Sequence, residues 1–133
     1  MATEFTVLLE DRPGALADWT EALAARGINI VGIHATPCPA EGIVQFVPNN
    51  VDATIEALRI ANKDYTTREV LQVSLEDRPG ALAQLARALG NAGININSLY
   101  ITMGRQIVLD VNDVRKAQEV AMSLGIGRST HGR

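Results

Sequence analysis

The spacing of apolar residues along the chain changes between two periods, and the changes occur in the same order twice. Short apolar segments rich in β-branched residues, at residues 4–9 and 70–75, have the length and composition of β-strands. Each is followed by a segment whose apolar residues recur three and four positions apart, as on one face of a helix. These positions are Leu16, Trp19 and Leu23 in the first segment, and Leu82, Leu85 and Leu89 in the second. The pattern therefore predicts a strand followed by an amphipathic helix, in two copies.

Each copy continues with two further strands, a second helix and a last strand. The further strands are predicted at residues 29–36 and 43–47 in the first copy, and at residues 95–103 and 106–111 in the second. Residues 37–42 are predicted as a longer loop, whereas residues 103–105 form a tight turn. Helical spacing then recurs at Val51, Ile55 and Leu58, and at Val114, Ala117, Ala121 and Leu124. The last strands are predicted at residues 64–69 and, more weakly, at 126–130. Each copy is thus an α+β, ferredoxin-like βαββαβ unit: an antiparallel sheet with two helices on one face.

The amino-acid sequence itself is duplicated. The nine residues LEDRPGALA occur at positions 9–17 and again at 75–83, and GINI occurs at 27–30 and again at 93–96. The same offset over both motifs indicates a repeated structural unit, so we expect two domains, at residues 1–68 and 69–133. Units of this size bury too little surface to be stable alone, and no flexible linker separates them. We therefore expect the two antiparallel sheets to pair edge to edge into one eight-stranded sheet.

Charge and composition exclude several classes of function. The 133 residues contain 12 Lys and Arg against 15 Asp and Glu, a net charge of −3 without a basic cluster. Nucleic acid and anionic membrane surfaces, which need such a cluster, are not expected as partners. The single cysteine, Cys38, cannot form an internal disulfide. No segment has the pattern of a signal peptide or of a membrane span, so a cytoplasmic location is expected.

The sequence contains no recognisable catalytic constellation. It lacks a Ser/His/Asp set, a phosphate-binding loop and a dinucleotide-binding fingerprint. His34 and Cys38 lie four residues apart, but no further metal-ligating residue type stands near them. We therefore expect a protein that is not an enzyme and holds no cofactor or metal.

In each copy a strand is followed by Asp-Arg-Pro-Gly-Ala-Leu and a helix, and Gly-Ile-Asn-Ile starts the next strand. This order of motifs resembles the ACT domain. The resemblance covers nearly the whole chain, twice, and is similar to small proteins made of two ACT domains alone. It implies an allosteric regulatory protein that binds a small amino acid at the interface between the paired domains. The implied ligand-binding residues are Asp11, Arg12, Pro13, Gly14, Ala15, Leu16 and Asn29, with their equivalents Asp77, Arg78, Pro79, Gly80, Ala81, Leu82 and Asn95.

The chemistry of these residue types suits an amino acid. A helix N-terminus carries free backbone amides and a partial positive charge, which attract an α-carboxylate. A glycine at position 14 or 80 lets a ligand approach those amides closely. Asp11 and Asp77 are candidates to pair with the α-ammonium group, and the two asparagines to hydrogen-bond either end.

Structural interpretations of the same residues remain open. Asp11 and Asp77 are also suited to capping the helices, and the two arginines to solvation or loose ion pairing. Asn29 and Asn95 are compatible with a simple turn between helix and strand. Structural roles are expected for Gly27 and Gly93, which end the helices in the left-handed conformation, and for Trp19, which packs in the core or between the units.

Two classes of function follow. The first is a regulatory protein that binds an amino acid and acts in trans on a metabolic enzyme. The second is a ligand-free assembly module that holds proteins together. A homodimer is expected in either case, because Val7, Leu9, Val73 and Leu75 are predicted to make the sheet face away from the helices partly apolar.

Overall fold

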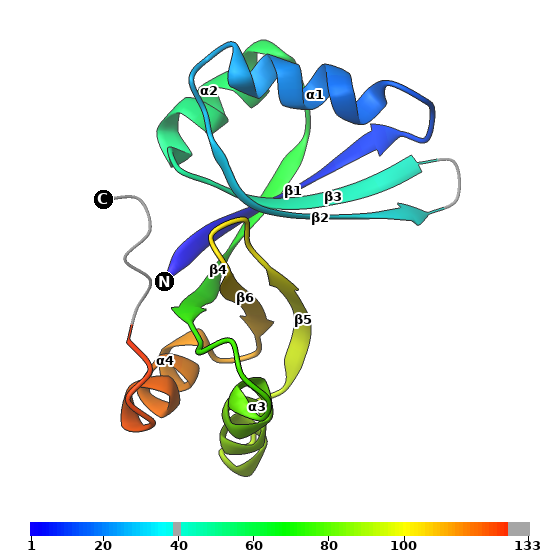
Figure 1. Cartoon of the computed structure of the whole chain (residues 1–133). Coiled ribbons are helices and arrows are strands. Elements are labelled where there is room, and N and C mark those ends of the chain that lie inside the picture. The colour runs from blue at the N-terminus through cyan, green and yellow to red at the C-terminus, as the bar shows by residue number, and fades with distance from the viewer. Residues whose placement is uncertain (39–40, 128–133) are drawn as a thin grey trace. The chain divides into compact units, whose positions relative to one another are not determined.

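Six strands and four helices make up the part of the chain that the computed structural model describes, residues 1–38 and 41–127 (Figure 1). The chain folds as two units, one of residues Thr3–Arg68 and one of residues from Glu69 onward together with Met1–Ala2. The elements, in chain order, are β1 (Ala2–Glu10), α1 (Ala15–Ala24), β2 (Ile30–Cys38), β3 (Glu41–Pro48), α2 (Val51–Ile60), β4 (Tyr65–Ser74), α3 (Ala81–Asn91), β5 (Ile96–Ile101), β6 (Gln106–Val111) and α4 (Val114–Ser123). None of the described helices is long and apolar enough to cross a bilayer.

The first unit is a sheet with two helices on one face. Its strand order is β2-β3-β1-β4, and β3 pairs antiparallel with both β1 and β2. Helices α1 and α2 lie on the same face of the sheet (Figure 1). In the core beneath them, Phe46 stacks on Phe5 with 5.6 Å between ring centroids, and Trp19 meets Phe46 edge-on at 6.2 Å. The order of strands and helices is the one predicted.

The second unit repeats this arrangement with the strand order β4-β6-β5. Leu109 of β6 lies opposite Leu71 of β4 and Leu99 of β5, in antiparallel register on both sides. Helices α3 and α4 pack on these strands around a fully buried core, to which Leu85 and Leu89 of α3 contribute. The fold is therefore ferredoxin-like in both units, with the order βαββαβ in the first and βαββα in the described part of the second.

The prediction of eight separate strands is wrong for the described residues. Residues 64–69 and 70–75 were expected as two strands, but no turn interrupts them, and they form the single strand β4. The weak strand expected at 126–130 begins with Ile126 and Gly127, which are not in a strand, while residues 128–130 lie outside the described part. The pairing of the two sheets edge to edge stays a prediction.

The loop expected at residues 37–42 is also largely strand. Pro37 lies opposite Gly42, and Cys38 lies opposite Glu41, so the β2–β3 pairing continues to the end of the hairpin. Proline is tolerated here because β2 is an edge strand and needs no hydrogen bond on its outer side.

The buried face of each first helix agrees with the prediction except at its first position. Leu16 and Leu82 were expected in the core, but they are 44% and 41% exposed, and the preceding Ala15 and Ala81 are buried instead. Residues 15, 19 and 23 form a row with a spacing of four, which follows one side of an α-helix closely. The exposed leucines are consequently free to line the surface beside the helix start.

The prediction about the open face of the sheet is wrong as well. Val7, Leu9 and Val73 are buried in the cores beneath the helices, so these residues point toward the helices and not away from them. On β1 the alternation of a strand instead turns Leu8, which is 48% exposed, to the opposite face. The homodimer stays a prediction, and the residues named for its surface do not supply one.

The left-handed glycines after the first helices are confirmed. Gly27 has a φ of 70° and Gly93 a φ of 76°. In each case the next residue donates its N–H back into the helix, Ile28 to Leu23 and Ile94 to Leu89. This closure turns the chain directly into β2 and β5.

Candidate functional site

The loops at residues 11–14 and 77–80 fold in the same way in both repeats. Arg12 N–H donates to the Glu10 carbonyl at 3.0 Å, and Arg78 N–H donates to the Glu76 carbonyl at 3.0 Å. Ala15 and Ala81 each donate back to the arginine carbonyl at 3.3 Å. The identical motif therefore produces one local structure twice, although the surrounding residues differ.

Each loop delivers the chain to an uncapped helix N-terminus. The N-cap positions are Gly14, with φ 88°, and Gly80, with φ 90°, and neither helix has a side-chain cap. The interpretation of Asp11 and Asp77 as helix caps is therefore wrong. The positive φ explains why glycine stands there, since residues with a β-carbon adopt this conformation at a cost. The Ala15 and Ala81 amides already donate to the arginine carbonyls, so the amides without an intrahelical acceptor are those of residues 16–17 and 82–83.

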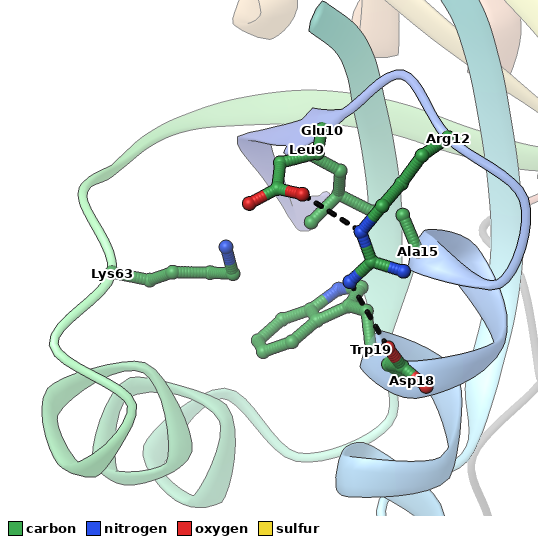
Figure 2. A pocket seen from close by; sticks show the side chains of 7 residues that line it. All are labelled: Leu9, Glu10, Arg12, Ala15, Asp18, Trp19 and Lys63. Carbon is green, nitrogen blue, oxygen red and sulfur yellow. Dashed lines mark hydrogen bonds and ion pairs between the residues drawn. The ribbon is translucent and has the colours of Figure 1, made fainter.

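Arg12 is held in place by two carboxylates. Its Nε donates to Glu10 Oε2 at 2.7 Å, and its Nη2 donates to Asp18 Oδ2 at 3.2 Å (Figure 2). The hydrogen bond to Glu10, followed by the one to Asp18, raises the pKa of the Arg12 guanidinium above its ordinary value. Ion pairing of this arginine is therefore confirmed, and its side chain stays half exposed.

Arg78 has the first of these partners and not the second. Its Nε donates to Glu76 Oε2 at 2.6 Å, but the position equivalent to Asp18 is Gln84. The nearby Arg105 places its Nη1 3.9 Å from Asp77 Oδ2, with both side chains well exposed. The rim of the second site thus has an additional cation that the first lacks.

A pocket lies between each loop and the adjacent strands β2 and β3, or β5 and β6. In the first repeat it has a volume of about 210 Å³, and its lining includes Asp11, Leu16, Thr36 and Val44. In the second it is larger, about 340 Å³, and is lined by Leu75, Glu76, Asp77, Arg78, Ala81, Leu82, Ile101, Arg105 and Ile107. The structure therefore brings most of the predicted loop residues together around a hollow in each repeat.

Asn29 and Asn95 lie away from the loops of their own repeats. They follow the far ends of α1 and α3, and a helix of ten residues is about 15 Å long. The Asn29 backbone exchanges two hydrogen bonds with Asn49, its N–H donating to Oδ1 at 2.9 Å and its carbonyl accepting from the Asn49 N–H at 2.9 Å. Asn95 does the same with Asn112. Within a repeat, these asparagines fasten the helix-to-strand turn to the end of the third strand.

Sequence reasoning missed Arg105 and Ile101 as pocket residues. The tight turn at residues 103–105 was predicted, and a hairpin necessarily returns β6 beside β5. The sequence pattern did not specify the strand register, and this register places the end of the hairpin beside the loop at residues 77–80. Among the residues that the structure describes, no group of three or more metal-ligating side chains occurs.

Comparison with known proteins agrees with this geometry. The model of the ACT domain matches residues 3–59 and again residues 70–122. No curated protein matches the chain. A solved protein from Bacteroides thetaiotaomicron is similar in structure, with a TM-score of 0.86 at 24% identity over 94% of this chain and 89% of that one. The ligand-free regulatory subunit of aspartate kinase from Thermus thermophilus gives 0.68 at 21% identity, over 91% and 90%.

Proposed function

Because the chain belongs to the ACT domain family, we propose that it is a regulatory protein that binds a small amino acid at the loops before α1 and α3. One observation carries the proposal. In both repeats an uncapped helix N-terminus and an exposed aspartate border the same pocket. An amino acid needs a donor for its carboxylate and an anion for its ammonium group a few ångströms apart, and each loop supplies both.

The loop residues have different roles in the proposed binding. The free amides of the first helical turns, at residues 16–17 and 82–83, receive the α-carboxylate, and Asp11 or Asp77 pairs with the α-ammonium group. Arg12 and Arg78 are committed to Glu10 and Glu76, so they shape the rim of the pocket. Pro13, Pro79, Ala15 and Ala81 hold the backbone, while Leu16 and Leu82 contact the ligand side chain. Asn29 and Asn95 complete the site from a second ACT unit, as the family pattern implies.

The second pocket supports a preference for an apolar side chain. Leu75, Leu82 and Ile107 line it, and Ile101 at its edge is well exposed. Burial of apolar ligand atoms against such a surface is favourable by roughly 25 cal/mol per Å². The smaller first pocket is lined by Ala15, Leu16 and Val44 and suits a shorter side chain.

We extend the proposal to a partner enzyme regulated in trans. By its name, the similar structure from Thermus thermophilus is a regulatory subunit of an enzyme. A protein that senses an amino acid and has no catalytic role of its own must change the activity of another protein. Binding of the amino acid and binding of that enzyme are then coupled reciprocally.

A ligand-free assembly module is the second candidate. Ile101 and Met103 at the β5–β6 hairpin are 66% and 75% exposed, and exposed apolar side chains that cluster often mark an association surface. In this case the protein would form its homodimer whether or not an amino acid is present.

A thermal-shift screen of the purified chain against the twenty common amino acids tests the proposal. A ligand at a hundred times its dissociation constant stabilises the native state by about 2.7 kcal/mol, which is easily measured. The double variant Asp11→Asn, Asp77→Asn should remove most of that shift, because it deletes the ammonium partners with little change of shape. Asp52→Asn, an exposed carboxylate on α2 that lines none of the pockets described, is the matched control and should keep the full shift.

Two outcomes would overturn the proposal. If no amino acid raises the melting temperature while light scattering shows a dimer, the assembly module is the better description. If a shift occurs but is equal in the loop variant and the control, the ligand binds elsewhere.

A further inference from the structure

The first repeat contains a second pocket, on the other side of the loop at residues 11–14. It has a volume of about 220 Å³ and is lined by Leu9, Glu10, Arg12, Ala15, Asp18, Trp19 and Lys63 (Figure 2). The pocket of the candidate site opens toward β2 and β3, whereas this one opens toward the segment between α2 and β4, which contributes Lys63. It is therefore a separate hollow that shares only the loop and its neighbours with the first.

The indole of Trp19 has a hydrogen-bond donor in this pocket that the protein leaves unused. The side chain is buried, with 5% exposed, and its Nε1–H finds no acceptor among the residues that the structure describes. In Figure 2 the indole nitrogen is on the edge of the ring toward Arg12. A buried N–H without a partner is unfavourable, and an acceptor atom that enters the pocket relieves that cost.

Lys63 gives the same pocket an uncommitted positive charge. Its side chain is half buried and extends into the pocket from the end of the α2–β4 connection (Figure 2). In the described part of the chain no carboxylate lies within ion-pair distance of its ammonium group. Glu10 and Asp18, the carboxylates that line the pocket, are instead engaged by Arg12 at 2.7 and 3.2 Å.

We propose that this pocket binds the carboxylate group of a small molecule, with Trp19 Nε1–H and the Lys63 ammonium group as its two donors. An anionic acceptor satisfies the buried indole N–H and the free lysine together, and a charged acceptor makes stronger hydrogen bonds than a neutral one. The volume of the pocket admits only a small molecule. Because Arg12 borders both pockets, the occupant also contacts the loop of the candidate site.

The second repeat has the same hollow without the donors. After α2, the Lys63 N–H donates to the Leu58 carbonyl, and after α4, the Ile126 N–H donates to the Ala121 carbonyl in the same way. Ile126 is therefore the equivalent of Lys63. The corresponding pocket, about 160 Å³, is lined by Gln84 and Ile126 among others, and Leu85 stands where the first repeat has Trp19. The proposed carboxylate site is consequently unique to the first repeat.

Fluorescence tests the proposal directly, because Trp19 is the only tryptophan in the chain. The full chain is titrated in the millimolar range with sodium acetate, alanine and the neutral isostere acetamide, at ionic strength held constant with sodium chloride. Acetate or alanine should change the emission in a saturable way, and acetamide should not. If acetate and alanine give an equal response, the ligand is a simple carboxylate. A much stronger response to alanine than to acetate indicates an amino acid whose ammonium group meets Glu10 or Asp18.

Two lysine variants separate this pocket from every other site. Lys63→Met should weaken binding at least about tenfold, since a hydrogen bond to a charged group is worth a factor of this size. Lys116→Met removes the only other lysine, exposed on α4, and should leave binding unchanged. Trp19→Phe keeps an aromatic ring without the N–H, and calorimetry should show weaker binding of the same probe.

The proposal is overturned if no carboxylate changes the emission, or if Lys63→Met and Lys116→Met bind the probe equally well. Either result would mean that Trp19 and Lys63 do not form a carboxylate site. The loop sites have a separate test, because Asp11→Asn, Asp77→Asn changes no residue that lines this pocket and Lys63→Met leaves both aspartates in place.

Discussion

The two repeats of this chain have the same loop but different surroundings. Arg12 and Arg78 make the same backbone hydrogen bonds at the same distances, and Gly14 and Gly80 have φ angles within a few degrees of each other. The first repeat then surrounds its arginine with two carboxylates and places an indole beneath it, whereas the second adds Arg105 and a larger apolar pocket. An identical nine-residue motif thus determines the loop, and the residues around it give the two adjacent pockets different chemistry.

Under the proposed function, this difference gives the two repeats separate specificities. The second pocket has more apolar lining beside its loop, and the first repeat has an additional hollow with two unused donors. The additional hollow of the first repeat differs from its counterpart at positions 18, 19 and 63, where the second repeat has Gln84, Leu85 and Ile126. Substitutions at matched positions of the two repeats test how far the comparison holds.

The largest expected effect concerns the core position that differs most, Trp19 against Leu85. Truncation of a buried aromatic residue to alanine costs about 3–5 kcal/mol and that of a leucine about 2–5 kcal/mol. We expect Trp19→Ala and Leu85→Ala to cost similar amounts, each about 3 kcal/mol, although tryptophan is much larger. The reason is that one side of Trp19 borders a pocket and makes fewer packing contacts there. Urea unfolding of both variants measures this, and a loss at Trp19 larger by several kcal/mol would show a fully packed indole.

The next effect should be equal in the two repeats. Gly14→Val and Gly80→Val each force a β-branched residue into the left-handed region, at a cost of about 1–3 kcal/mol. Gly90→Ala is the control, because this glycine lies inside α3, has no atom within 4 Å of an added β-carbon, and should gain about 0.5–1 kcal/mol. Thermal melts of the three variants suffice. Unequal losses at positions 14 and 80 would mean that the loops are less alike than their hydrogen bonds indicate.

The smallest effect concerns the asparagines that fasten the helix-to-strand turns. Asn49 Oδ1 accepts from the Asn29 N–H at 2.9 Å, and Asn112 Oδ1 accepts from the Asn95 N–H at 3.1 Å. Asn49→Ala and Asn112→Ala each remove one such bond at an exposed site, so each should cost about 0.5–1 kcal/mol. Hydrogen exchange at the amides of Asn29 and Asn95 should speed up only in the matching variant. If exchange at these amides stays slow in both variants, the side-chain hydrogen bonds of Asn49 and Asn112 do not stabilise the turns.

The sequence by itself determined the duplicated βαββαβ order, because the periods of strand and helix are local properties of the chain. It also determined the left-handed turns after the helices, since only glycine adopts them cheaply, and it pointed to the loops at residues 11–14 and 77–80 as a site. It predicted most of the buried helical face correctly but misplaced the first position, at Leu16 and Leu82, because the exact start of a helix depends on loop geometry.

Only the tertiary structure decided which side chains meet around those loops. The ion pairs of Arg12, the arrival of Arg105 beside Asp77, and the hollow between Trp19 and Lys63 each join residues that are distant in the chain or on different elements. Spacing along a sequence specifies neither the register of a hairpin nor the direction of a long side chain, because both depend on packing against neighbours. The two repeats therefore look almost identical in their motifs and differ in the chemistry of their pockets.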